Sequence, residues 1–560
     1  MLNKRWHNGR ELQADADSVL IGSIDQGTGS SRFLVFSSST GALITYHQEE
    51  VDIIYPRNGW AEANPDQLVQ SVLSCISSAV SNLAALGIAA NRIGCIGIAN
   101  QRETLVAWDR RTGEPVHPAI LWLDARTEQT VERLIATTRS RSAAEFRSIC
   151  GLPITTYFTG VKIRWLLDNV PAARELQSSG NLMMGTVDTW LLYKLTGEYA
   201  TDVTNASRTM LLDLATCQWD PRLCRFFGLD QKMLPKVCSS AELFGRISVA
   251  DCPLAGVPIT GILGDQQAAL VGQGCLESGD TKNTYGSGCF MLCNTGLSPV
   301  VSSSGLLTTV AYQLGRSAAP VYALEGSVAV AGTAIRWLRD SLGIVGSVAE
   351  TETLAGKVPD TAGCYFVPAF NGLYCPYWRS DARGLIVGLT GATSREHLCR
   401  AALEAVCYQS RELLDCMETE CGTTLNRIKV DGGMTSNRLL MQLQADLAGV
   451  TVVRPEMAET TALGAAVAAA WGHGIDMTAS VRQSSVTEFY PMTGPVDRLR
   501  KFQRWLDAVQ RSIGWHRQED DGEGDAGGSS AGSLGSAGHL AFAVFLVGSA
   551  ALLALSLSVK

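Results

Sequence analysis

Five short segments of this chain combine carboxylates, hydroxyl groups and glycines in the way that phosphoryl transfer to an alcohol requires. In chain order they are residues 23–32 (SIDQGTGSSR), 100–103 (NQRE), 264–267 (GDQQ), 283–288 (NTYGSG) and 431–437 (DGGMTSN). No single segment decides the chemistry. Their order and combination indicate two phosphate-binding turns, a base, a polyol-binding pair and a nucleoside-binding turn, which are the parts of an ATP-dependent sugar or polyol kinase.

The first turn, residues 25–32, is built from small residues. Its glycines let the backbone approach a ligand closely, so that N–H groups can bind phosphate oxygens. Thr28 and Ser30 add hydroxyl donors, Arg32 adds a positive charge, and Gly29 adds a backbone contact. Asp25, at the end of the preceding strand, could hold a Mg²⁺-bound water. A plain hairpin turn is the alternative, and the Gly-Lys-Ser/Thr of a Walker A loop does not occur here.

Two later turns repeat this pattern. Ser287 offers a hydroxyl between two glycines and is expected near the terminal phosphates. After a short strand, Gly433 and Asn437 follow Asp431, an arrangement in which glycine admits an adenine ring and asparagine bonds its edge. Taken alone, the Ser287 turn is equally well explained as a tight turn between core strands, and the pair of glycines after Asp431 is a weak signal.

Asp265 is the sharpest candidate for chemistry. It ends an apolar strand at residues 257–263, and ligands bind in open α/β sheets at such strand ends. A carboxylate there can accept the proton of a substrate hydroxyl during phosphoryl transfer, and Gln266 could orient a neighbouring hydroxyl. The alternative is an N-cap aspartate that opens the following helix.

Arg102 and Glu103 place a multiple donor beside an acceptor, as vicinal hydroxyls require. Trp122, Tyr157 and Phe290 could form an apolar wall against a small carbon skeleton. The alternatives are a surface ion pair for the charged residues and ordinary core packing for the aromatic ones.

The elements that position these residues repeat once. Strand-turn-strand patterns occur at residues 19–37 and again at 280–294, about 260 residues apart. Apolar spacing predicts helices at residues 65–86, 327–342, 397–417, 436–448 and 461–471. We therefore predict an α/β fold of two duplicated domains with a cleft between them and a boundary near residues 272–279.

Length and composition agree with a multidomain enzyme. The 560 residues are too many for one core, and 46% are hydrophobic and 18% charged. A net charge of −8 argues against a nucleic-acid partner. The sixteen cysteines are scattered without zinc-ligand spacing, as expected of reduced thiols in a cytosolic enzyme.

The C-terminal segment differs from the rest. Residues 540–559 form an apolar run of bilayer-spanning length after an acidic Gly/Ser-rich stretch. We predict a tail anchor, that is, a transmembrane helix that holds the enzyme on an intracellular membrane; a buried C-terminal helix is the alternative. The predicted parts are an N-terminal extension (1–18), two kinase domains (19–272 and 273–515), a flexible linker (516–538) and the anchor (539–560).

The motifs resemble the FGGY family of carbohydrate kinases over residues 19–515. The resemblance is carried by residues 25–28 (DQGT), 100–104 (NQRET), 264–270 (GDQQAAL), 282–286 (KNTYG), 370–374 (FNGLY), 377–384 (YWRSDARG) and 431–433 (DGG). It implies two actin-like, ribonuclease-H-like domains that close on ATP and glycerol. The implied reaction moves the γ-phosphoryl group to glycerol, giving sn-glycerol 3-phosphate and ADP, through which glycerol enters glycerolipid and carbohydrate metabolism.

The resemblance also implies a role for each site residue. Asp265 would be the catalytic base, and Asp25 and Asp265 would face Mg²⁺. Glycerol would contact Arg102, Glu103, Trp122, Tyr157, Asp265, Gln266 and Phe290. The nucleotide would be lined by Thr28, Gly29, Ser30, Arg32, Ser287, Gly332, Gly433 and Asn437. Gly29, Ser287, Asn371 and Cys375 depart from the usual family residues.

Animal members of this group associate with the mitochondrial outer membrane. We therefore expect this protein to be located on that membrane, facing the cytosol, or in the cytoplasm. We also expect it to form a homo-oligomer. Three other functions fit parts of the sequence: a kinase for another small polyol or a ketose, a non-catalytic ATP-binding membrane scaffold, and an actin-like chaperone ATPase. The last predicts a peptide-binding β domain, whereas a linker and an apolar segment follow here.

Overall fold

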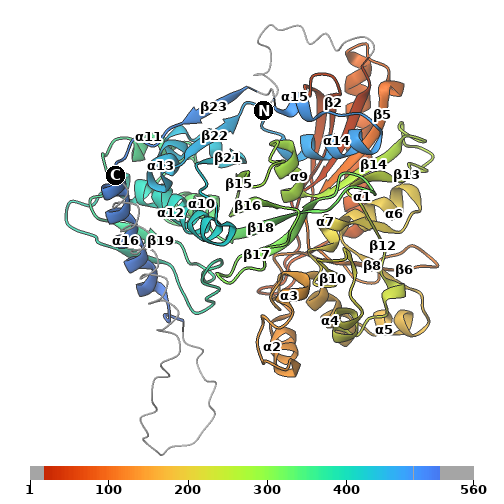
Figure 1. Ribbon diagram of the computed structural model, residues 1–560, viewed down its shortest axis with the longest axis horizontal. Helices are drawn as coiled ribbons and strands as arrows, with labels where there is room; N and C mark the ends of the chain where they lie inside the picture. The colour runs from red at the N-terminus through yellow and green to blue at the C-terminus, as the bar shows by residue number, and fades with distance from the viewer. Residues whose placement is uncertain (1–17, 483–484, 517–560) are drawn as a thin grey trace, which may run out of the picture. The chain divides into compact units, whose positions relative to one another are not determined.

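The computed structural model describes residues 18–482 and 485–516 (Figure 1). The predicted N-terminal extension, apart from residue 18, lies outside the described residues. So do the linker beyond residue 516 and the predicted membrane anchor at 539–560. The described chain is called here the N-terminal half, residues 18–272, and the C-terminal half, residues 273–516.

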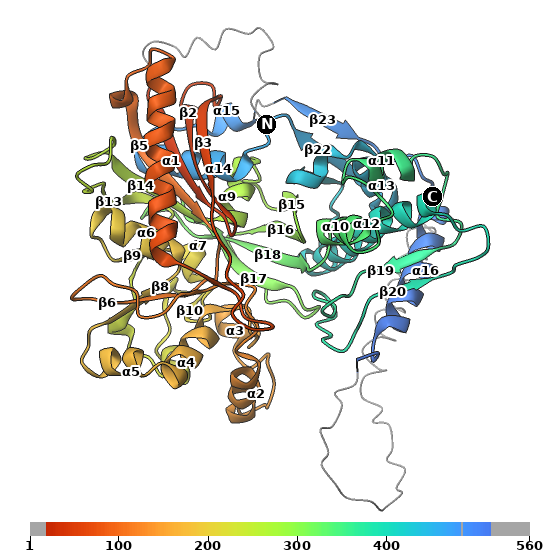
Figure 2. The same ribbon diagram turned by 180° about the vertical axis from the view of Figure 1, so that it is seen from behind.

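A six-stranded sheet forms the centre of the N-terminal half, in the order β13-β14-β5-β1-β2-β3. Its strands are β1 (Leu20–Gln26), β2 (Ser30–Ser37), β3 (Leu43–Glu50), β5 (Ile93–Asn100), β13 (Ala241–Arg246) and β14 (Pro258–Gly264). The β1–β2 hairpin is antiparallel, whereas β1, β5 and β14 run parallel. Helix α1 (Pro65–Ala85) packs on β2 and β3 and stands in front of the sheet in Figure 2.

A seven-stranded sheet forms the centre of the C-terminal half, in the order β17-β18-β16-β15-β21-β22-β23. Its strands are β15 (Thr281–Tyr285), β16 (Cys289–Gly296), β17 (Leu307–Tyr312), β18 (Val321–Val328), β21 (Arg427–Asp431), β22 (Thr451–Pro455) and β23 (Val486–Phe489). The covering helices are α10 (Gly332–Asp340), α11 (Glu350–Ala355), α12 (Arg395–Cys421), α13 (Arg438–Ala448) and α16 (Pro495–Ser512).

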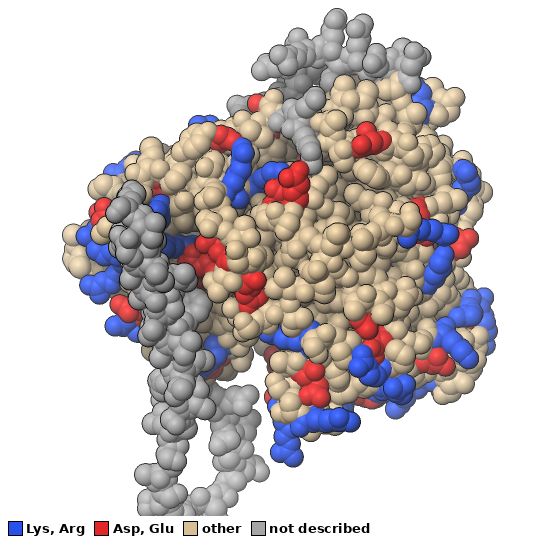
Figure 3. All heavy atoms as spheres, viewed as in Figure 1, with Lys and Arg blue, Asp and Glu red and all other residues tan. Residues whose placement is uncertain are grey.

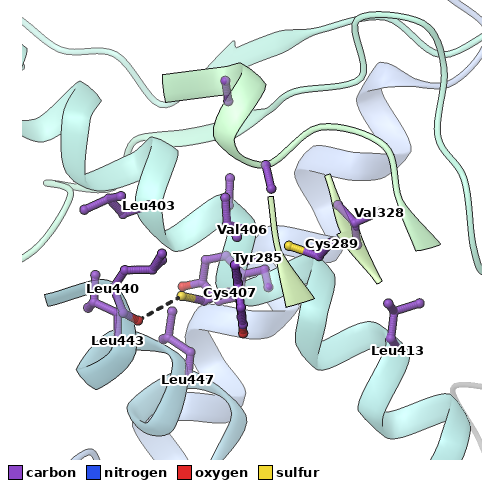
Figure 4. Close-up of a cluster of buried hydrophobic side chains, with 14 of the residues drawn as sticks. Tyr285, Cys289, Val328, Leu403, Val406, Cys407, Leu413, Leu440, Leu443 and Leu447 are labelled. Atoms are coloured by element: carbon purple, nitrogen blue, oxygen red, sulfur yellow. Dashed lines mark hydrogen bonds between the residues drawn. The ribbon is translucent and has the colours of Figure 1, made fainter. Parts of the chain in front are cut away.

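The core of this half is a layer of side chains between sheet and helices. Figure 4 shows Tyr285, Cys289 and Val328 from the strands facing leucines of α12 and α13. The Cys407 thiol of α12 contacts the Leu440 carbonyl of α13, with 3.8 Å between sulfur and oxygen. The apolar spacing in the sequence predicts both helices because this layer needs one continuous apolar stripe on each of them.

Both predicted strand-turn-strand units are confirmed, as β1–β2 and β15–β16. The prediction of a helix over residues 327–342 is wrong at its start. Residues up to Val328 belong to β18, and α10 begins only at Gly332. A buried apolar strand followed closely by an amphipathic helix gives one apolar run in the sequence, and such a run by itself predicts a single helix.

Two short helices cross between the sheets. Helix α9 (Asp265–Gly272) follows β14, and α14 (Thr460–Gly472) follows β22. They pack closely on each other, yet α14 covers β1, β5 and β14 of the N-terminal half. The predicted domain 273–515 is therefore continuous in sequence but not in space, because its alanine-rich helix belongs to the core of the other sheet.

An insertion between β5 and β13 builds a lobe on the N-terminal half. Its main elements are β6 (Val106–Asp109), β8 (Leu182–Gly185), α2 (Glu128–Thr137), α4 (Thr159–Asn169), α5 (Pro171–Ser178), α6 (Val187–Thr196), α7 (Val203–Ala206) and α8 (Pro221–Phe227). Among the described residues, α1 is long and apolar enough to pass for a membrane span. Its buried residues pack in the core of the N-terminal half.

Candidate active site

A buried network of charged groups lies at the ends of β5 and β14. Arg102 is only 3% exposed, and its two terminal nitrogens donate to Glu325 of β18 at 2.6 and 2.9 Å. Glu103 accepts a 2.5 Å hydrogen bond from Nε of Arg208. The alternative of a surface ion pair is therefore wrong. On the face drawn in Figure 3, exposed charges of both signs are interspersed, whereas these charges are enclosed.

Asp265 lies beside this network at the start of α9. Its Oδ1 is 3.2 Å from Nε of Arg102 and accepts a 2.7 Å hydrogen bond from the backbone N–H of Gln266. Gly264 is the N-cap residue, so Asp265 is not the cap of the helix. Burial raises the pKa of the carboxyl above its usual value and Arg102 opposes that rise. A partly exposed carboxylate with a raised pKa suits a proton acceptor.

Gln266 is held by a neighbour that sequence reasoning assigned no role. Its amide oxygen accepts a 2.5 Å hydrogen bond from Nζ of Lys282, which also donates to the Thr284 hydroxyl at 2.8 Å. Burial lowers the pKa of Lys282 to about 8. Only the amide NH₂ group of Gln266 is left to orient a substrate hydroxyl.

The predicted aromatic wall is assembled from both halves. The ring of Trp122 lies edge-to-face with Tyr157 at 5.7 Å and with Phe290 of β16 at 6.0 Å between centroids. Its indole N–H donates to the Thr28 hydroxyl at 2.9 Å. The structure thus brings these three rings together and ties them to the first turn.

Glu103 has an unusual backbone. Its φ is 62°, a left-handed conformation that costs a non-glycine residue on the order of 1 kcal/mol or more. The Thr159 hydroxyl donates to its carbonyl at 3.1 Å and helps hold this conformation. Strain of this kind is concentrated at functional sites, and here it directs the Glu103 carboxylate toward Arg208.

The first turn is arranged around two carboxylates. The guanidinium Nη1 of Arg32 lies 2.8 Å from Glu459 and 3.7 Å from Asp25, so its charge is already shared. Burial raises the pKa of Asp25 to about 7, Arg32 opposes the rise, and Glu459 and Asp265 add to it. Gly29 at the tip is exposed, and no atom lies within 4 Å of where its side chain would start.

The second turn is tied to the start of α10. Backbone N–H groups of Ala331 and Gly332 donate to the carbonyls of Ser287 and Gly286 at 2.8 and 3.1 Å. A side chain at Gly332 would lie 2.6 Å from the Gly286 carbonyl oxygen, so this close approach requires glycine. The exposed Arg336 donates to the Ser287 hydroxyl at 2.9 Å and brings a positive charge to the turn.

A cleft of about 720 Å³ runs along the ends of β21 and β22. Asp25, Arg32 and Gly433 are among the predicted site residues that line it. The other predicted nucleotide contacts, Thr28, Gly29, Ser30, Ser287, Gly332 and Asn437, are not part of its lining. The side-chain oxygen of Asn437 accepts from the N–H of Leu440 at 2.8 Å and caps α13, which leaves only its amide group for a base edge.

Sequence reasoning missed four residues of the site: Arg208, Lys282, Glu325 and Arg336. Glu325 had a visible signal, because it is a single carboxylate within an apolar strand. Lys282 belongs to the segment 282–286 (KNTYG), but no role follows from its place there. Arg208 and Arg336 have no local pattern, since their partners lie 105 and 49 residues away in the chain.

Comparisons with known proteins agree with this geometry. Residues 20–272 match the N-terminal domain of the FGGY family of carbohydrate kinases, and residues 281–473 match its C-terminal domain. A probable glycerol kinase of Caenorhabditis elegans is 50% identical over 501 residues, covering 89% of this chain and 99% of that protein. A glycerol kinase of Brucella anthropi is 49% identical over 503 residues, covering 88% and 99%.

Solved structures give the same result. A crystal structure of Plasmodium falciparum glycerol kinase with ADP superposes with a TM-score of 0.82 at 35% identity, covering 88% of this chain and 98% of that one. A xylulose kinase from Brucella ovis, at 22% identity and a TM-score of 0.74, shares the fold. The predicted α/β fold of two actin-like domains is confirmed, and the chain belongs to the FGGY family of carbohydrate kinases.

Proposed function

We propose that the protein is an ATP-dependent glycerol kinase, which transfers the γ-phosphoryl group of ATP to glycerol and releases sn-glycerol 3-phosphate and ADP. The observation that carries the proposal is the ion pair between Asp265 and Arg102, with 3.2 Å between Oδ1 and Nε. Glu103 and the ring of Trp122 complete a small site with charged and apolar walls. The similarity to glycerol kinases over almost 90% of the chain supports the same acceptor.

In this proposal Asp265 accepts the proton of the reacting hydroxyl. Arg102 donates to one of the remaining glycerol hydroxyls, and Glu103 accepts from another. The aromatic rings of Trp122 and Phe290 cover the carbon skeleton and exclude water. Transfer of a phosphoryl group depends mainly on such positioning and on charge stabilisation.

The carboxylates of the site fit a magnesium ion that arrives with the nucleotide. Burial is the main cause of the raised pKa of Asp25, and the negative charges of Glu459 and Asp265 add to it, a repulsion that a divalent cation would relieve. No group of three or more metal-ligating side chains occurs among the described residues. Mg²⁺ bound to ATP needs only one or two protein carboxylates, here Asp25 and Asp265, and it would neutralise charge on the phosphates.

The test is ADP release by the purified full-length protein with ATP and Mg²⁺, measured for glycerol and for a panel of other polyols, ketoses and gluconate. We expect kcat/KM to be at least about tenfold higher for glycerol than for any other acceptor. Faster reaction with a ketose would identify a different carbohydrate kinase. ATP binding without transfer to any acceptor would support the scaffold.

We also propose that residues 540–559 anchor the enzyme to an intracellular membrane, the mitochondrial outer membrane facing the cytosol, and that the enzyme is a homo-oligomer. The apolar run of bilayer-spanning length supports the anchor. After carbonate extraction the full chain should stay with membranes, and a variant ending at residue 516 should be released with its turnover intact. Full-length protein in the soluble fraction would contradict the membrane anchor. A monomer in light scattering would contradict the homo-oligomer.

A further inference from the structure

Glu325 is a carboxylate that the transfer reaction does not itself require. It lies in the middle of β18 in the C-terminal half and is completely buried. Burial alone would raise its pKa, but Arg102 and Arg208 outweigh that effect and hold the pKa at about 2. The side chain is therefore ionised at every pH at which an enzyme of this kind is assayed.

The two cations that form ion pairs with Glu325 both come from the N-terminal half. Arg102 follows β5 and binds both carboxylate oxygens, at 2.6 and 2.9 Å. Arg208 follows α7 and donates to Oε1 at 3.2 Å. Arg208 also binds Glu103, so the carboxylates of Glu103 and Glu325 are linked through one guanidinium.

This arrangement decides which way Arg102 faces. Its Nη1 donates to Gln267 at 3.3 Å as well as to Glu325, which fixes the plane of the guanidinium. The Nε atom then lies 3.2 Å from Oδ1 of Asp265 and 4.0 Å from Oε1 of Glu103. Without Glu325 the terminal nitrogens of Arg102 would be free to form a bidentate ion pair with Asp265, which is the strongest geometry between an arginine and a carboxylate. Such a pair would withdraw both groups from the substrate.

We propose that Glu325 is the positioning residue of the acceptor site: it orients Arg102 directly and Glu103 through Arg208, so that the polyol-binding pair is complete only when both halves of the molecule meet. The inference rests on the proposed function, because it concerns the site that function assigns to glycerol. It also makes Glu325 a determinant of specificity, since the recognition of adjacent hydroxyls depends on the two groups it orients.

The test is the Glu325→Gln variant of the full-length protein, which keeps the shape of the side chain and removes its charge. We expect KM for glycerol to rise at least about tenfold while KM for ATP stays within about twofold. The ratio of kcat/KM for glycerol to that for propane-1,2-diol, which lacks one hydroxyl, should fall at least about fivefold. Equal changes in both KM values, or an unchanged selectivity ratio, would overturn the proposal.

Two further variants separate positioning from stability. Glu404→Gln is the matched control, because Glu404 is also a buried carboxylate and its partners, Arg400 at 3.1 Å and Tyr408, lie on its own helix α12 and not in the site. It should leave both KM values within about twofold of wild type. Glu325→Asp keeps the charge and should restore part of the glycerol affinity.

If Glu325→Gln does not fold, calorimetric titration of the Asp variant with glycerol and with ATP decides the matter. Weaker glycerol binding with unchanged ATP binding supports the proposal, and unchanged glycerol binding overturns it. A wild-type protein that fails to phosphorylate glycerol would overturn the proposed function instead, so the two failures are distinguishable.

Discussion

The two halves of the molecule use one sheet plan and place opposite chemistry at the ends of its strands. In each half, the first strand of an antiparallel hairpin (β1 or β15) begins a row of three parallel strands, β1-β5-β14 or β15-β21-β22. An antiparallel strand, β13 or β23, forms the edge of the sheet beside the last of them. In the N-terminal half, β5 and β14 deliver Arg102, Glu103 and Asp265. The matching strands β21 and β22 of the C-terminal half deliver glycines and a loop that line the cleft.

A shared frame can therefore carry two kinds of site. Charged side chains at strand ends suit a small polyol, which is recognised through its hydroxyls. Glycines suit a nucleotide, because the backbone must come close to a large flat ring and to phosphates. At Gly432, where φ is 90°, a side chain would lie 2.4 Å from the carbonyl oxygen of Tyr285, so glycine is required there.

Changing the strand-end carboxylate of the N-terminal half should have the largest effect. For Asp265→Asn we expect kcat to fall by roughly 10²–10⁴, because the proton acceptor is lost while the shape of the site is kept. Stopped-flow measurement of nucleotide binding should show affinity within about threefold of wild type. A turnover within threefold of wild type would mean that another group takes the proton.

The crossing helices join the two sheets, and they provide a second way to break the comparison. A side chain on Gly464 of α14 would start 1.8 Å from the carbonyl oxygen of Ala268 in α9. Gly464→Ala must therefore push the helices apart, and we expect unfolding to become easier by about 3 kcal/mol or more. The control is Gly391→Ala, since Gly391 has open space around it. Equal melting temperatures for the two variants would contradict this packing.

Asp25 and Asp431 sharpen the comparison, since each is a carboxylate at the end of a central strand. Asp431 also lines the cleft, but its Oδ2 is already occupied, because it accepts from Gln273 at 2.8 Å and from the Thr460 hydroxyl. Asp25 has a cationic partner only at 3.7 Å and a pKa of about 7. We expect Asp25→Asn to lower kcat/KM by roughly tenfold or more, and Asp431→Asn to lower stability instead.

The pH dependence of the wild type follows from the same shift. An ionised Asp25 is needed to meet a cation, so activity should fall as the pH drops below about 7. The stability of the folded state should depend on pH in the opposite direction. Because the folded state holds the Asp25 proton more tightly than the unfolded chain, the contribution of this group declines as pH rises from about 4 to about 7. Melting curves of Asp25→Asn should lack that decline, and a variant less stable than wild type at pH 8 would contradict it.

The strand-turn-strand units and the residues at strand ends could be predicted from the sequence because each depends on a local pattern. Asp265 and Arg102 stand directly after apolar strands, and their place in the sheet follows from that position alone. Glu325 could not be assigned a role, because its meaning comes from a contact with Arg102 across 223 residues of chain. The crossing of α14 onto the other sheet is equally non-local, since an alanine-rich helix does not reveal which sheet it covers.

The smallest expected effect concerns Arg336, the nucleotide-side counterpart of Arg102. Arg102 is buried and held by carboxylates, whereas Arg336 is exposed on α10 and donates to the hydroxyls of Ser287 and Thr333. An exposed guanidinium beside a phosphate-binding turn gains less from its charge, because water screens it. We expect Arg336→Ala to raise KM for ATP by roughly three- to tenfold and to leave KM for glycerol unchanged. The Arg336→Lys variant, measured at low and at high salt, tests whether a positive charge alone is enough for ATP binding. A point charge should restore the affinity for ATP only at low ionic strength. A rise in KM for glycerol would place this residue with the acceptor, and the division of labour between the two halves would then fail at this position.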